Sequence, residues 1–198
     1  MANSRIIWQH EVCQAEKIAQ GLIKEGKVDV GWKTVLVPSK TMAYLRSERI
    51  LHQTRKKLLF TKKLAFNAAK EISRGNDRAY EMGLIVMKTR KILEKQKKGL
   101  YTEKVRSRQM DEIEWLMDHY LRLLNSDGET YENSLKRAYS TPNKYLSFLN
   151  QLIKLEEEVF LEAVHGRKGS KKDRLGGFEK VHTISEKVRI RDAERIFK

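Results

Sequence analysis

The sequence predicts an all-α protein, a helical bundle of five or six helices. Three observations lead to this class. Only two prolines and 11 glycines interrupt 198 residues, apolar residues recur at steps of three and four through most of the chain, and the breaks carry typical helix-capping residues. With 40% hydrophobic and 34% charged residues, the chain has the composition of a globular protein on the polar side of the usual range.

The first predicted helix runs from Ser4 to about Glu25, because its apolar residues lie at helical spacing and Gly26 follows. We expect Cys13, which stands among apolar residues of this helix, to be a small core residue. The next stretch is the one rich in β-branched residues, and it predicts a minor extended segment near 28–37.

The longest periodic region follows Pro38 and Ser39. It has neither proline nor glycine from Thr41 to Ser73, so we expect one long amphipathic helix over about 40–74, roughly 50 Å in length. Its apolar line holds Leu51, Leu58, Ala65, Ala68 and Ile72.

The helices predicted next each begin after a capping residue or a turn. Asp77, Thr102 and the pair Thr141-Pro142 are typical N-terminal signals. The expected helices span about 78–98, 103–124, 129–138 and 142–165. The organisation that follows is a helical domain over 1–165, a flexible basic linker over 166–180, and a small C-terminal helical element over 181–198.

Charge is segregated along the chain, and this is its strongest functional signal. Residues 40–108 carry 20 Lys and Arg against six Asp and Glu, residues 109–162 carry five against 11, and residues 163–198 carry 11 against five. The chain as a whole has a net charge of +15. Net charge reports on partners rather than on fold, so the sequence points to a polyanion.

Helical periodicity arranges the basic residues in two rows. One row follows the long helix opposite its apolar line, the second follows the next helix, and the predicted linker adds a third basic group. Rows of Lys and Arg with few aromatic residues suit contacts to phosphate rather than to base edges. The predicted nucleic-acid-binding residues are Arg46, Arg49, Lys56, Lys63, Lys70, Arg74, Lys88, Lys91, Lys95, Lys98, Lys171, Lys172 and Arg174.

Two other interpretations of the rows stay open at this point. A row of Lys is often a solvated helix face, and the acidic helices of 109–162 are able to pair with the basic ones internally. Complete pairing still leaves the region 40–108 at a net charge of +8. We expect Tyr44, Phe60 and Phe66, near the first row, to be packing residues rather than base-stacking ones.

We therefore expect a non-enzymatic protein that binds DNA or RNA mainly through the phosphate backbone, as an accessory or regulatory part of a nucleoprotein assembly. The acidic segment 109–162 would face a protein partner. The alternative function is an interaction adaptor that docks an acidic protein or an anionic membrane surface.

Signatures of other functions are lacking in the sequence. It holds no nucleotide-binding, hydrolase or zinc-protease motif, so neither a cofactor nor a metal is expected, and the acidic group Asp111, Glu112 and Glu114 is expected to be a solvated or partner-facing patch. His10, His52 and His182 have no evident partners. Residues 183–197 resemble a helix-turn-helix only weakly, and a packing helix is favoured. One cysteine and no apolar run of about 20 residues favour an intracellular location, cytoplasmic or at the nucleoid or nucleus.

Overall fold

The computed structural model describes residues 2–24, 51–95, 101–165 and 171–198. Within these ranges all regular secondary structure is helical, which confirms the all-α class. The described part holds more helices than the five or six expected, namely a helical segment over 51–58, α1 (Ala2–Lys24), α3 (Phe60–Ile72), α4 (Arg78–Lys95), α5 (Glu103–Leu124), α6 (Tyr131–Tyr139), α7 (Pro142–His165) and α8 (Lys171–Phe197). The extended segment predicted near 28–37 lies outside the described residues.

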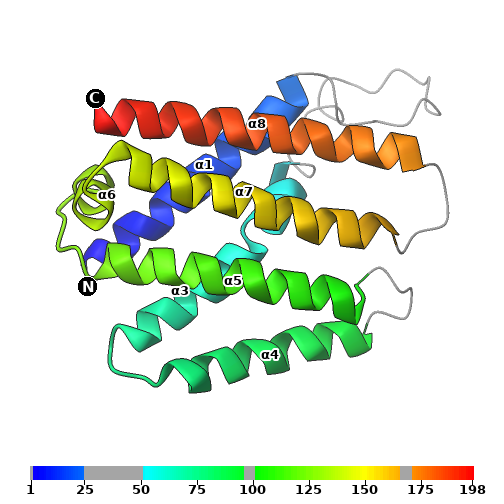
Figure 1. Ribbon diagram of the computed structural model, residues 1–198, viewed down its shortest axis with the longest axis horizontal. Helices are drawn as coiled ribbons and strands as arrows, with labels where there is room; N and C mark the ends of the chain where they lie inside the picture. Colours follow the sequence, from blue (N-terminus) through cyan, green and yellow to red (C-terminus); the bar gives the residue numbers. More distant parts are fainter. Residues whose placement is uncertain (1, 25–50, 96–100, 166–170) are drawn as a thin grey trace, which may run out of the picture.

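Four long helices lie side by side in the order α8, α7, α5, α4 (Figure 1). Helices α1 and α3 cross behind them, α1 against α8 and α3 against α5, and the short α6 connects α5 to α7 at one end. The largest core cluster draws on both layers and is rich in aromatic residues, among them Phe66, Tyr120, Tyr139, Tyr145 and Phe148.

Local capping sets the helix starts that the sequence predicts. The Asp77 carboxylate accepts a hydrogen bond from the Tyr80 amide at 2.8 Å, and the Thr102 hydroxyl accepts one from the Val105 amide at 3.2 Å. Each satisfies an amide that the first helical turn leaves without a partner. Gly75 has φ +106°, a conformation that favours glycine, and it turns the chain between α3 and α4.

The helix predicted over about 40–74 is described from residue 51 onward, and it is interrupted at Leu59. This residue is a turn between the segment 51–58 and α3. Hydrogen bonds from Leu59 N to Arg55 O (3.0 Å) and from Lys63 N to Leu59 O (2.9 Å) continue across it. The basic row and its apolar line therefore keep their helical spacing through the turn.

The C-terminal region differs from the sequence prediction at its start. Helix α8 begins at Lys171, so residues 171–180, predicted as part of a flexible linker, are helical. Residues 183–197 lie inside the same uninterrupted helix, which agrees with the packing helix that the sequence favours over a helix-turn-helix. Ala193 and Ile196 of α8 belong to the largest core cluster.

Cys13 is exposed rather than buried, which corrects the expectation of a core residue. The buried line of α1 includes the polar residues Glu11 and Gln14. The inward face of α1 therefore includes two polar positions and does not include Cys13. A prediction that places only apolar residues on the inward face does not find this orientation.

Candidate nucleic-acid interface

The first basic row lies on the solvent side of the segment 51–58 and α3. Its described members are Gln53, Lys56, Phe60, Lys63, Asn67, Lys70 and Arg74. Lys56 and Lys63 are exposed, and neither forms an ion pair with another described residue. Toward the end of the row, Glu71 lies 3.9 Å from the Lys70 amine and 2.7 Å from the Arg74 guanidinium, so this end is partly neutralised.

The second basic row lies on α4, where Lys88, Lys91 and Lys95 are exposed. Helix α4 buries only Glu81, Ile85 and Thr89, one line of residues at steps of four. Its other residues are half-buried or exposed, so the second row stands on a thinly attached helix.

The side chains of the remaining predicted contact residues are not described by the structure. Arg46, Arg49 and Lys98 lie outside the described residues. Lys171, Lys172 and Arg174 lie in the first turns of α8, where the helix is described but their side chains are not. The described members of the two rows thus lie on the segment 51–58 with α3 and on the neighbouring α4.

The acidic segment 109–162 pairs mainly with arginines that belong to neither row. Asp118 and Glu114 of α5 bind Arg78 at 2.5 and 3.2 Å, Glu158 of α7 lies 3.3 Å from Arg108, and Glu132 lies 3.0 Å from Arg195. Several acids predicted to face a protein partner therefore form ion pairs within the bundle. The exposed lysines of the rows are not among the residues that they neutralise.

Buried charges inside the bundle were not predicted from the sequence. Glu11 of α1 and Lys62 of α3 form an ion pair with only 4% and 5% of their surfaces exposed. Burial alone would raise the pKa of Glu11, but the Lys62 ammonium lowers it to about 2. A buried carboxylate and ammonium each need the other as a partner, so this pair fixes how α1 sits against α3.

A second buried group joins α3, α5, α7 and α8. Thr61 donates a hydrogen bond to Glu112 at 2.6 Å, and Arg189 binds Glu156 through both terminal nitrogens at 2.6 and 2.7 Å. Burial and the nearby Glu156 carboxylate raise the pKa of Glu112 to about 7. The expected solvated patch at Asp111, Glu112 and Glu114 is therefore wrong for Glu112, which is buried.

Histidines also have partners that the sequence did not reveal. His10 Nε2 lies 3.0 Å from Asp192, and the His10 ring stacks on Tyr131 with centroids 3.5 Å apart. His119 shares a hydrogen bond of 2.7 Å with Tyr139, and burial lowers its pKa to about 3.

These missed residues share one signal that the sequence does contain. Each buried charge stands at an inward position of its helix, as Lys62 does between Leu58 and Ala65. A charged residue on an otherwise apolar line indicates a buried pair. The identity of the partner, 51 residues away for Lys62 and 33 for Arg189, needs the fold.

An apolar cavity of about 380 Å³ lies beside the first row. Trp8 of α1 and Leu59, Phe60 and Leu64 form its walls, and Lys56, Lys63 and Asn67 also line it. Phe66 is buried in the core, as expected, whereas Phe60 is half-buried and lines this cavity.

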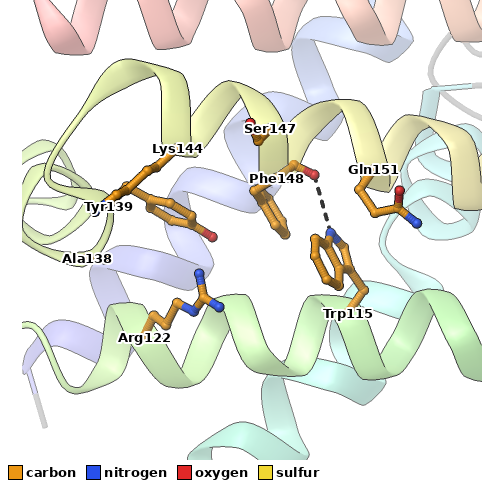
Figure 2. Close-up of a pocket in the computed structure, with 8 residues that line it drawn as sticks. All are labelled: Trp115, Arg122, Ala138, Tyr139, Lys144, Ser147, Phe148 and Gln151. Atoms are coloured by element: carbon orange, nitrogen blue, oxygen red, sulfur yellow. Dashed lines mark hydrogen bonds between the residues drawn. The ribbon is translucent and has the colours of Figure 1, made fainter.

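A larger cavity of about 870 Å³ lies between α5 and α7 (Figure 2). Trp115 and Phe148 stack with centroids 6.0 Å apart, and the Trp115 indole donates a hydrogen bond to the Phe148 carbonyl at 3.3 Å. Arg122 lies 5.8 Å from the Tyr139 ring centroid, and Lys144 also lines the cavity. The lining combines aromatic surface with two cations.

The described part of the chain offers neither a metal site nor a membrane-spanning helix. No three His, Cys, Asp or Glu side chains within it are placed to hold a metal ion. None of its helices has the length and apolar character that crossing a bilayer requires.

Comparisons with models of protein families, with curated proteins and with solved structures find no match to this chain.

Proposed function

We propose that the protein binds nucleic acid through the phosphate backbone, without catalysis, as an accessory or regulatory part of a nucleoprotein assembly. One observation carries the proposal. The exposed lysines on α3, α4 and the segment 51–58 are not used by the acidic segment, whose described ion pairs go mainly to arginines outside the two rows. Internal pairing thus leaves these lysines available to an external polyanion.

Phosphate backbones suit this surface for two reasons. Each Lys that binds a phosphate releases condensed counterions, which drives association without reading sequence. Two rows on adjacent helices present charge over an area rather than at a point, as backbone contacts require.

The proposal is tested by measuring affinity for single- and double-stranded DNA and RNA as salt is raised. Four to six phosphate contacts give a log–log slope of roughly −3 to −5 on duplex DNA. Absence of binding at low ionic strength, or an affinity that does not change with salt, contradicts the proposal.

A charge-matched pair of variants separates the rows from net charge. The test variant reverses Lys56, Lys63 and Lys70 to Glu. The control reverses Lys136, Lys154 and Lys187, which are exposed on α6, α7 and α8. Both variants change the net charge equally, so a decrease in slope by two or more units in the test variant alone assigns binding to the first row.

The adaptor function is a second candidate, and the cavity in Figure 2 favours it. Aromatic residues and Arg in a partly buried cleft are typical of the central residues of protein interfaces, and this cleft lies within the acidic segment. Because its two charges are those of Arg122 and Lys144, the partner would be acidic. Binding of poly-L-glutamate that is lost in the Arg122→Ala/Lys144→Ala variant supports this candidate, and binding unchanged in that variant contradicts it.

A further inference from the structure

The cavity beside the first row lies between cations and is walled by aromatic rings. Residues 56, 60, 63 and 67 follow steps of four, three and four, so they share one helical line, and all four line the cavity. Lys56 and Lys63 are separated by about two helical turns, or roughly 10 Å along the axis. The residue between them on this line is Phe60.

The aromatic walls are held in place by the core. Trp8 stacks on buried Phe66 with centroids 5.4 Å apart and planes at 26°, and Phe66 in turn meets Tyr120 edge to face. Trp8 and Phe60 are themselves half-buried and line the cavity. They offer apolar ring surface that is already in place, which lowers the entropic cost of binding a planar group.

The size and chemistry of the cavity fit a nucleobase. Its volume of about 380 Å³ lies in the range of small-molecule sites. Every base has a π-face that stacks on aromatic side chains without regard to sequence. In a duplex these faces are covered by neighbouring base pairs, so only an unpaired base is able to enter.

We infer that this cavity seats an unpaired base of a single-stranded nucleic acid, stacked on Trp8 and Phe60, with the flanking phosphates on Lys56 and Lys63. The inference rests on the proposed function and narrows its ligand to single strands. Charge complementarity favours this occupant, because the two lysines at the cavity are exposed and form no ion pair with another described residue.

The first experiment compares full-length protein with Phe60→Leu and Trp8→Leu variants, which keep apolar side chains but remove a π-face. Affinity for a dT₁₂ oligonucleotide and for a 12-base-pair duplex is measured by fluorescence anisotropy at fixed salt. We expect each variant to bind the single strand roughly 5- to 150-fold more weakly, the value of one lost stacking contact, and the duplex within about twofold of the wild type. Trp115→Leu, on the far cavity between α5 and α7, is the matched control.

The second experiment uses Trp8 as the reporter, in a Trp32→Phe/Trp115→Phe background whose helicity is checked by circular dichroism. Saturable quenching of Trp8 fluorescence by dT₁₂, with heparin at equal charge giving none, supports the inference. Equal quenching by heparin or by poly-L-glutamate overturns it, because neither polymer carries a base.

The outcomes also distinguish this inference from the proposed function. If single strands and duplexes bind equally with steep salt dependence, and Phe60→Leu changes neither, backbone binding stands and the base site is overturned. If no nucleic acid binds at low salt, the proposed function is overturned and the base site with it.

Discussion

The two basic rows have the same spacing in the sequence but different surroundings in the fold. Helix α3 buries six of its 13 residues, whereas α4 buries three of 18, so α3 is fixed by the core and α4 is attached along one line. The row on α3 borders an aromatic cavity. On α4 the exposed large apolar residues are Tyr80 and Met87, 61% and 54% exposed.

This difference indicates two modes of binding to a polyanion. A row on a firmly packed helix beside a cavity is able to hold a ligand in one register. A row on a thinly attached helix adds electrostatic attraction for the polyanion along the whole length of that helix. The periodicity of Lys residues does not distinguish these cases, whereas the burial behind each row does.

The largest effect expected from this comparison concerns stability. Replacing Lys62 of α3 with Met leaves Glu11 charged and buried, and we expect the free energy of unfolding to fall by about 3–5 kcal/mol. The same change at exposed Lys91 of α4 should stay within about 0.5 kcal/mol. Urea unfolding followed by circular dichroism at pH 7 measures both.

The double variant Glu11→Gln/Lys62→Met serves as the control for this pair. Because it removes both charges together, it should recover much of the stability lost in Lys62→Met. Equal costs for Lys62→Met and Lys91→Met would contradict the difference between the two helices.

The next effect depends on pH and concerns the contact of α3 with α5. The pKa of Glu112 is raised to about 7, above the value of about 4.3 in an unfolded chain. The folded state therefore keeps a proton that the unfolded state releases, and this stabilisation is complete below about pH 4 and is lost as pH rises through 7. The lowered pKa of His119 has the opposite effect, because it makes the free energy of unfolding rise with pH up to about pH 6.5.

The Glu112→Gln variant separates the contribution of the Glu112 carboxyl to the pH dependence of stability from the contribution of His119. Relative to the wild type, its stability should rise by up to about 3 kcal/mol between pH 5 and pH 8, measured by urea unfolding at each pH. Glu114→Gln is the matched control, since Glu114 is an exposed carboxylate on the same helix that faces Arg78 of α4. Parallel pH profiles for the wild type and Glu112→Gln would show that Glu112 does not titrate in this range.

A smaller effect is expected on the affinity for nucleic acid, and it differs between the two rows. Reversing Lys56 and Lys63, or Lys88 and Lys91, to Glu should each lower the salt slope on a single strand by about 1.4 units, two contacts at roughly 0.7 each. Only the first pair should also remove the preference for single strands over duplexes, because only that pair borders the cavity. Loss of preference in the α4 pair would place the base site elsewhere.

The smallest effect is expected at the attachment of α4 to α5. Arg78 is partly exposed and binds Asp118 and Glu114, and pairs of this kind contribute about 0.2–1 kcal/mol. Arg78→Ala should therefore cost no more than about 1 kcal/mol in chemical denaturation, and less at high salt. A cost equal to that of Lys62→Met would mean that α4 is as firmly held as α3.

The starts of several helices were predictable because their signals are local. Asp77 and Thr102 cap the helices that follow them through atoms three residues away. The inward and outward lines of α3 were predictable for the same reason, since helical period alone places Ala65 and Ala68 opposite Lys63.

Features that depend on distant segments were not predictable. Lys62 needs Glu11, 51 residues away, and the cavity at Phe60 needs Trp8 from another helix. The basic composition of residues 166–180 indicated a linker, yet residues 171–180 are helical. Lys and Arg are good helix formers, and the helix continues into a stretch that packs on α1 and α7, although Gly176 and Gly177 lower its intrinsic propensity.

The packing of α1 against α8 has a consequence for the order in which the bundle assembles. Gln14 donates a hydrogen bond to Asp192, 178 residues later, at 3.0 Å. During synthesis α1 leaves the ribosome long before α8 exists, so Gln14 has no native partner until α8 has been made. Contacts of such sequence separation slow folding relative to bundles with local contacts. Until α8 docks, the part of α1 that packs on it is open to chaperones.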